Sequence, residues 1–305
     1  MRMSLSLLTS CRILCSSNKR HLSNNHDSAL ITHKSETKRL FAIFVGSKQN
    51  TMTGKPNYKE LRALDQDVEK ETARFLDMHY YSWFKENFQR INDRDEQLKG
   101  KDVILSSPKY GLKNAIIDEK SASHYVAFEG KHSLPTFAFE LSFIRKSGDW
   151  TMGWLLDPEK VTEYYLVTWP WAKKKNCIPY DFGRKDKEGK NDPYYFYTCE
   201  DIVKLEFALI SRKKLLDYLA EKGFTSERLL QDEQEIRRNK GNWQWLNDLK
   251  KRIEEEQGFN FSDNTKPKTG FYYTFTDSLE EKPVNLVIYK ETIKEIAEKM
   301  SVIIP

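Results

Sequence analysis

The stretch GKDVILSSPKYGLKNAIIDEK, from Gly100 to Lys120, decides the fold that the sequence predicts. Its pattern indicates two strands joined by a turn, one beginning at Asp102 and the other ending at Lys120. Because a strand alternates its faces, Asp118 and Lys120 project to the same side, about 6.6 Å apart along the backbone. A hairpin of this kind brings Asp102 beside Asp118. Two carboxylates and a lysine on one rim suit a divalent metal ion and a water molecule, which predicts a nuclease.

Electrostatics favours a cation between the two aspartates. Two carboxylates about 4 Å apart repel each other by about 4 kcal/mol at an effective dielectric constant of 20. Unless a cation intervenes, one of them should take up a proton. Oxygen ligands suit Mg²⁺ or Mn²⁺ better than Zn²⁺. A lone Asp-x-Lys is common by chance in a chain with 31% charged residues, and the alternative is a surface hairpin with solvated charges.

A helix is predicted before the hairpin, over residues 57–88. Its apolar residues recur at three- and four-residue spacings, and they are Leu61, Leu64, Val68, Phe75 and Leu76. Glu69 precedes Leu76 by seven residues, so the two side chains point in nearly the same direction. Glu69 is therefore expected at the border of the buried face.

The order of these residues resembles a known family. A helix glutamate (Glu69), a strand aspartate after a glycine (Asp102) and the sequence Asp118-Glu119-Lys120 resemble the PD-(D/E)XK, or restriction-endonuclease-like, nuclease superfamily. The position of Glu69 and the hairpin length are similar to those of its junction-resolvase-like branch. The resemblance covers about residues 57–168, and it departs from the motif at Lys101, where the family's proline would stand.

The resemblance implies a Mg²⁺- or Mn²⁺-dependent enzyme that hydrolyses phosphodiester bonds of duplex or branched DNA. Glu69, Asp102, Asp118 and Lys120 would be the catalytic residues. Asp102, Asp118, Glu69 and the backbone carbonyl of Glu119 would be the metal ligands. Lys120 would orient or help to deprotonate the attacking water and would stabilise the developing charge. The Glu119 side chain is expected on the opposite face of its strand.

The predicted fold class is α/β (α+β), with a mixed central sheet flanked by helices. Strands are expected over residues 101–105, 115–121, 136–144, 150–156, 162–169, 270–276 and 284–289. A long basic loop is expected over residues 171–192. Helices are expected over residues 199–223, from residue 225 or 226 to Gly241, from Asn242 onward, and over residues 291–300. Residues 52–198 would form the restriction-endonuclease-like core. Residues 199–305 would form an appended helical region with a short β-hairpin.

Residues 1–51 differ in composition from the rest of the chain. Their net charge is +6, whereas that of the whole chain is +5, so the charges of residues 52–305 sum to −1. A DNA-binding surface on the folded part must therefore be a local patch. This segment is expected to be disordered, and it is interpreted as a mitochondrial leader or as translated upstream sequence before a true start at Met52. No apolar run approaches the roughly 20 residues of a membrane helix.

Cysteine usage and the remaining alternatives complete the prediction. Cys177 and Cys199 are expected to be reduced and buried, which suits a cytoplasmic protein. The main alternative to a nuclease is a catalytically silent nuclease-fold protein of a mobile element or phage, acting as a nucleic-acid-binding or interaction module. A third reading is an unrelated α+β protein with a structural role. A homodimer is an alternative to a monomer.

Overall fold

The computed structural model describes residue 58 and residues 60–305, except 187, 241, 259–267 and 278. The predicted leader, residues 1–51, and Met52 lie outside the described residues. The described chain forms six α-helices: α2 (Leu61–His79), α3 (Arg94–Leu98), α4 (Arg212–Glu221), α5 (Ser226–Arg238), α6 (Trp243–Glu256) and α7 (Lys290–Ile296). None of these helices combines the length and apolarity that crossing a membrane requires.

The described strands form three sheets. The central sheet has the order β1 (Phe88–Arg90), β2 (Val103–Ser107), β3 (Leu112–Ser121), β6 (Tyr164–Ala172), β9 (Ile202–Ser211) and β12 (Lys299–Ile303). The second has the order β10 (Phe271–Phe275), β11 (Val284–Tyr289), β4 (Thr136–Ile144) and β5 (Trp150–Met152). The third pairs β7 (Ile178–Tyr180) with β8 (Tyr194–Phe196).

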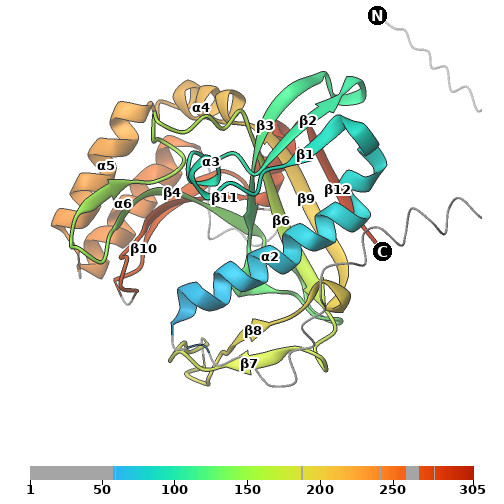
Figure 1. The fold of residues 1–305 in the computed structure, drawn as a ribbon. Helices are drawn as coiled ribbons and strands as arrows, with labels where there is room; N and C mark the ends of the chain where they lie inside the picture. The colour runs from blue at the N-terminus through green and yellow to red at the C-terminus, as the bar shows by residue number, and fades with distance from the viewer. Residues whose placement is uncertain (1–57, 59, 187, 241, 259–267, 278) are drawn as a thin grey trace, which may run out of the picture. The chain divides into compact units, whose positions relative to one another are not determined.

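The central sheet is mixed, which confirms the predicted mixed α/β class. The strands β3 and β6 run parallel, whereas the other neighbours in this sheet are antiparallel. A parallel pair needs a long crossover connection, and here the crossover contains β4 and β5 of the second sheet. Figure 1 shows α2 crossing in front of the central sheet, with α4, α5 and α6 grouped beside the second sheet.

The predicted hairpin is present as β2 and β3. The two strands pair antiparallel from Val103 opposite Ile117 to Ser107 opposite Leu112. A short 3₁₀ turn joins them and ends at Gly111, whose φ of +67° is in the left-handed region that glycine adopts without strain.

Helix α2 packs one apolar face against this hairpin. Its side chains Leu64, Val68, Phe75 and Leu76 are buried, as their spacing predicts. They join a hydrophobic cluster that includes Ile117 of β3. Each such side chain stabilises the fold by about 1.5–3 kcal/mol through burial. The helix is thereby fixed over the sheet beside the end of β3.

Two helix predictions in the last third of the chain are wrong. Residues 202–211 form strand β9, and only Arg212–Glu221 of the predicted 199–223 segment is helical. Residues 299–303, next to the short helix α7, form strand β12 instead of continuing the predicted 291–300 helix. Strand β9 is a central strand and its residues 207–210 are all buried. A strand buried on both faces has a continuous apolar run, which periodicity does not distinguish from a helix.

The predicted boundary at residue 198 does not separate two cores. Residues 199–305 supply β9 and β12 to the central sheet and β10 and β11 to the second sheet. A single hydrophobic cluster joins Phe139 of β4, Tyr165 of β6 and Leu229 of α5. The described residues from 58 to 305 accordingly belong to one compact unit.

Smaller features complete the comparison with the sequence. Thr225 and Asn242 cap the N-termini of α5 and α6 with their side chains, as predicted. The predicted loop over 171–192 is interrupted by strand β7, which pairs with β8. Cys177 and Cys199 are both buried and free, which confirms the cysteine prediction.

Candidate functional site

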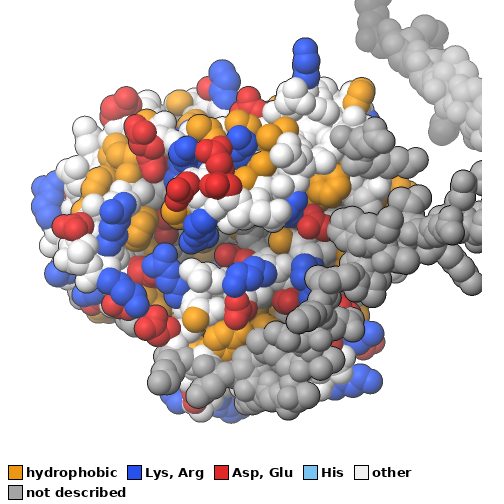
Figure 2. All heavy atoms as spheres, viewed as in Figure 1, with side chains coloured by type: hydrophobic (Ala, Val, Ile, Leu, Met, Phe, Trp, Pro, Cys, Tyr) orange, Lys and Arg blue, Asp and Glu red, His pale blue; other side chains and the backbone are white. Residues whose placement is uncertain are grey.

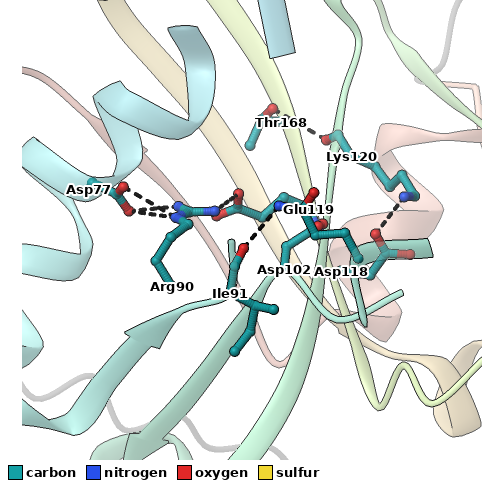
Figure 3. A network of polar contacts seen from close by, with 9 residues as sticks. Asp77, Arg90, Ile91, Asp102, Asp118, Glu119, Lys120 and Thr168 are labelled. Carbon is teal, nitrogen blue, oxygen red and sulfur yellow. Dashed lines mark hydrogen bonds and ion pairs between the residues drawn. The ribbon is translucent and has the colours of Figure 1, made fainter. Parts of the chain in front are cut away.

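The candidate site lies where the pairing of β2 with β3 begins. Because Val103 pairs with Ile117, Asp102 lies beside Asp118, one step beyond the paired segment. Figure 3 shows Asp118 and Lys120 extending to one side of β3, and Glu119 extending to the other. The hairpin therefore brings together the two aspartates and the lysine, as the alternation of a strand dictates.

The Glu119 side chain belongs to an ion network on the α2 side of the sheet. Its carboxylate lies 2.6 Å from Arg90, and Arg90 also lies 2.6 Å from Asp77 of α2. The side chains of Arg90 and Glu119 are 18% and 12% exposed, so solvent screens this pair only partly. The network connects α2, β1 and β3, and it commits the Glu119 side chain to a structural contact.

The backbone of Glu119 faces the aspartates. Its N–H donates a 2.8 Å hydrogen bond to the Asp102 carboxylate. Glu119 lies beyond the paired part of the hairpin, which begins at Val103 and Ile117. In antiparallel pairing the N–H and C=O of one residue point to the same neighbour. The Glu119 carbonyl is therefore directed to the same side as Asp102.

Asp118 is buried at the base of the site. The residue is 1% exposed, and its Oδ1 accepts a 2.5 Å hydrogen bond from Lys120 Nζ. Its second oxygen, Oδ2, is buried and has no hydrogen-bond partner among the described residues. An unpartnered carboxylate oxygen in the interior costs several kcal/mol of desolvation, so this atom is poised to accept a ligand.

Lys120 carries its positive charge at neutral pH. Burial alone would lower the pKa of this amine, but Asp118 and Asp102 outweigh burial and hold the pKa above its ordinary value. The Nζ atom also lies 5.3 Å from the centre of the Trp154 ring, a favourable cation–π distance. An amine that keeps its proton can stabilise negative charge, but it cannot take a proton from water.

Asp102 has a perturbed carboxyl group. Burial raises its pKa to about 7, Lys120 partly offsets this effect, and the charges of Asp118 and Glu119 raise the pKa further. A carboxyl group that retains its proton near neutrality beside a second carboxylate is the expected state of such a pair without a cation.

We expect this pKa to make metal-free stability depend on pH. Between about pH 4 and 7 the folded state retains the Asp102 proton that the unfolded state loses, so the unfolding free energy falls as pH rises. Asp102→Asn removes this contribution. In denaturation with a chelator present, the stability of the variant relative to wild type should increase from pH 5 to pH 8. An equal difference at every pH would contradict the assignment.

A cavity of about 850 Å³ opens in front of these residues. It is lined by residues of α2, α3, β3, β4 and β5, so both sheets contribute to its walls. Glu69 of α2 lines it too, and its side chain is exposed to the cavity. The surrounding protein raises the pKa of Glu69 by desolvation, and Lys120 opposes this shift. Glu69 thus faces the same cavity as the hairpin residues.

Several cavity residues were not predicted from the sequence. Glu140 of β4 lines the cavity, and burial raises its pKa to about 7, with Lys120 acting in the opposite direction. Arg94 of α3 and Arg145, just after β4, are exposed cavity residues. Neither guanidinium has an ion pair or hydrogen bond within the described part of the chain. Of these residues, Glu140 alone has a recognisable signal in the sequence, because an acidic residue interrupts an otherwise apolar predicted strand.

Basic side chains are frequent around the opening. Arg62, Lys70 and Lys160 also line the cavity. Figure 2 shows Lys and Arg side chains mixed with acidic ones on the face that α2 and α3 form. The cavity lining therefore combines basic and acidic side chains in similar numbers.

Gly100 is fixed by close packing against the site. Its φ is +80°, and a Cβ there would lie 2.1 Å from Thr162 Oγ1 and 3.2 Å from Asp118 Oδ2. The Thr162 hydroxyl donates to the Gly100 carbonyl at 2.9 Å. A glycine is therefore required here both by backbone conformation and by the space beside Asp118.

Gly100→Ala should lower the unfolding free energy by at least about 3 kcal/mol, since strain at positive φ adds to a steric overlap that the buried threonine cannot relieve. Gly130→Ala is the matched control, because Gly130 has a similar φ of +78° and no atom within 4 Å of its Cβ position. The control should lose only about 1–2 kcal/mol. Equal losses in urea denaturation would contradict the steric account.

The carboxylates fit a divalent cation bound by few protein ligands. Mg²⁺ is commonly held by one or two carboxylates, with water and substrate phosphate completing its shell. Asp118 Oδ2 without a partner and the raised pKa of Asp102 are both relieved by a cation. Within the described residues, however, no three His, Cys, Asp or Glu side chains converge as a metal-binding group. Glu69 therefore faces the cavity without joining the two aspartates in a three-carboxylate set.

Comparison with protein-family models, with curated proteins and with solved structures found no match to this chain.

Proposed function

We propose that this protein is a metal-dependent nuclease that hydrolyses DNA phosphodiester bonds at the end of β3. The observation that supports the proposal most strongly is the Asp118–Lys120 pair at the base of a large cavity, with Asp102 beside it. A buried carboxylate with one unpartnered oxygen is costly for a purely structural role. A perturbed pKa in such a cavity is characteristic of functional sites.

The fold supports a restriction-endonuclease-like core as part of the proposal. Helix α2 precedes an antiparallel hairpin, β2 and β3, and β3 then pairs in parallel with β6. In this arrangement Asp118 and Lys120 lie on β3, Asp102 immediately precedes β2, and Glu69 lies on the helix. The crossover from β3 to β6 through the second sheet adds Glu140 and Trp154 to the walls of the cavity.

The residues would act by binding, orienting and charge stabilisation. Asp102, Asp118 and the Glu119 carbonyl would hold Mg²⁺ or Mn²⁺, which when bound polarises the phosphate and lowers the pKa of water. Lys120, which keeps its proton, would stabilise negative charge that develops on the phosphate oxygens. Glu69 would accept a hydrogen bond from the attacking water or from a water near the metal ion.

The test is cleavage of end-labelled DNA by the full-length protein. We expect cleavage of DNA in Mg²⁺ or Mn²⁺ and none after addition of excess EDTA, with activity restored when the metal ion is returned. Linear, plasmid and branched substrates should be included, since the sequence leaves duplex and branched DNA open. Absence of cleavage of any substrate in either metal ion would overturn the proposal.

One observation favours the second candidate, a nucleic-acid-binding protein without catalysis. Lys120 already neutralises Asp118, and no set of three potential metal ligands exists in the described residues. A protein of this kind would bind DNA through the basic side chains that line the cavity, such as Arg94 and Arg145. Its affinity for DNA would not depend on metal ions. DNA binding in EDTA that is unaffected by Asp102→Asn and Asp118→Asn, with no cleavage in Mn²⁺, would favour it.

A further inference from the structure

We infer that the substrate enters the cavity as a single strand, so that the site acts on single-stranded nucleic acid or on unpaired strand ends rather than on the interior of a duplex. This inference rests on the proposed nuclease function. It follows from the depth of Asp118, the size of the cavity, an unpacked aromatic side chain on its wall and two free arginines at its rim.

The carboxylate of Asp118 lies at the base of the cavity and not on the open surface that an intact duplex would contact. Asp118 is 1% exposed, and Lys120 beside it has a side chain that is 25% exposed. A phosphate that approaches both groups must enter the cavity, which residues of α2, α3, β4 and β5 line. The phosphates of a duplex are fixed on a rigid cylinder, whereas those of a single strand can enter with their own nucleotide.

The volume of the cavity matches a strand segment. At about 850 Å³, it lies within the range of roughly 300–1,000 Å³ that encloses a drug-sized molecule. A sphere of this volume is roughly 12 Å across, about the width of the major groove of B-DNA alone. The cavity can therefore accommodate about one or two nucleotides, but it cannot enclose a B-DNA duplex.

One wall presents an aromatic side chain that the fold does not use. Phe143 of β4 is partly buried and lines the cavity. It belongs to neither of the two hydrophobic clusters found in the described residues. Met152 lines the same wall. An unpaired base needs such a stacking surface, and stacking on an aromatic ring is worth about 1–3 kcal/mol per base.

Two cations at the rim have no protein partner among the described residues. Arg94 lies at the start of α3, and Arg145 follows β4, so the two come from different walls of the cavity. Both are exposed and unpaired within the described residues. By contrast, Arg62 is paired with Glu281 and Lys70 with Asp67. Free guanidiniums from two different elements suit the flanking phosphates of an entering strand.

The test compares five DNA substrates with the full-length protein in Mn²⁺: a linear single strand, a circular single strand, a blunt duplex, a forked duplex with unpaired arms and a relaxed closed circular duplex. We expect cleavage of the linear single strand and of the unpaired arms to be at least about a hundredfold faster than cleavage of the closed duplex, as loss of about 3 kcal/mol of binding implies. Cleavage of the circular single strand would show that a strand can enter without a free end, whereas cleavage of the linear strand alone would show that an end is required. Either result supports the inference.

Equal rates on the closed circular duplex and on the single strands would overturn the inference and leave the nuclease proposal intact. No cleavage of any substrate would overturn both. Variants provide a second readout. Arg94→Ala, Arg145→Ala and Phe143→Ala should each raise KM for the linear single strand by about 5- to 50-fold with little change in kcat.

The matched controls are Lys251→Ala for the arginines and Trp83→Ala for the phenylalanine. Lys251 is an exposed cation on α6 and Trp83 is an 80% exposed aromatic, and neither lines the cavity. Their KM values should remain at the wild-type level. If the three cavity variants keep the wild-type KM, as the two controls should, the strand path that we infer is wrong.

Discussion

Asp118→Asn should reduce DNA cleavage by at least about a thousandfold, equivalent to about 4 kcal/mol of transition-state stabilisation. Asparagine has nearly the same shape, but it removes the negative charge that would hold a cation at the base of the cavity. The fold should be retained, because Asp102 remains to compensate Lys120. Initial rates on end-labelled single-stranded DNA in Mg²⁺ and in Mn²⁺ measure the effect.

The control for this variant is Asp217→Asn. Asp217 is 54% exposed on α4, and it pairs with the exposed Lys213 at 2.5 Å. The same chemical change there should leave cleavage within about twofold of wild type, since an exposed ion pair contributes little. If Asp118→Asn retains more than about a tenth of the wild-type rate, the carboxylate has no catalytic role.

Lys120→Met should lower both cleavage and stability. Removal of one preorganised charge from a site of this kind costs about a hundredfold or more in rate. The variant also leaves Asp118 and Asp102 without their cation. Loss of one partner of a fully buried pair costs about 3–5 kcal/mol. Because the Lys120 side chain is 25% exposed, solvent screening should reduce this to about 1–3 kcal/mol. Cleavage rates in Mg²⁺ measure the loss of activity, and urea denaturation with a chelator present measures the loss of stability.

The double variant Asp118→Asn/Lys120→Met separates the two roles of the lysine. With both charges removed, the unfolding free energy should recover toward that of wild type, which is the coupling that a double-mutant cycle detects. Cleavage should stay absent. Additive losses of stability in the double variant would show that the 2.5 Å contact of Lys120 with Asp118 does not couple the two residues.

Local patterns in the sequence were sufficient for the hairpin and its three site residues. Period-two alternation alone places Asp118 and Lys120 on one face, and pairing of β2 with β3 brings Asp102 beside them. The bounds of β4 and β11 also match the predicted 136–144 and 284–289 segments. Both strands combine dense apolar residues with clear turn signals, so their local and tertiary preferences agree.

The other side of the site depends on contacts that local patterns do not contain. Glu140, Phe143 and Arg145 reach the cavity because the second sheet lies opposite the end of β3. The Glu119–Arg90 ion pair joins residues 29 positions apart. The helix predicted over β9 is wrong because residues 207–210 of this strand are buried on both faces, and periodicity does not distinguish such an apolar run from a helix. In each case, long-range packing decided the outcome.

The most direct test of the account is the location of Mn²⁺ by anomalous scattering in crystals of the full-length protein with a non-hydrolysable single strand. We predict one anomalous peak about 2–2.5 Å from carboxylate oxygens of both Asp102 and Asp118, with a substrate phosphate in the same cavity. A strand bound in the cavity with no Mn²⁺ at either aspartate, or Mn²⁺ bound only elsewhere, would contradict the central claim.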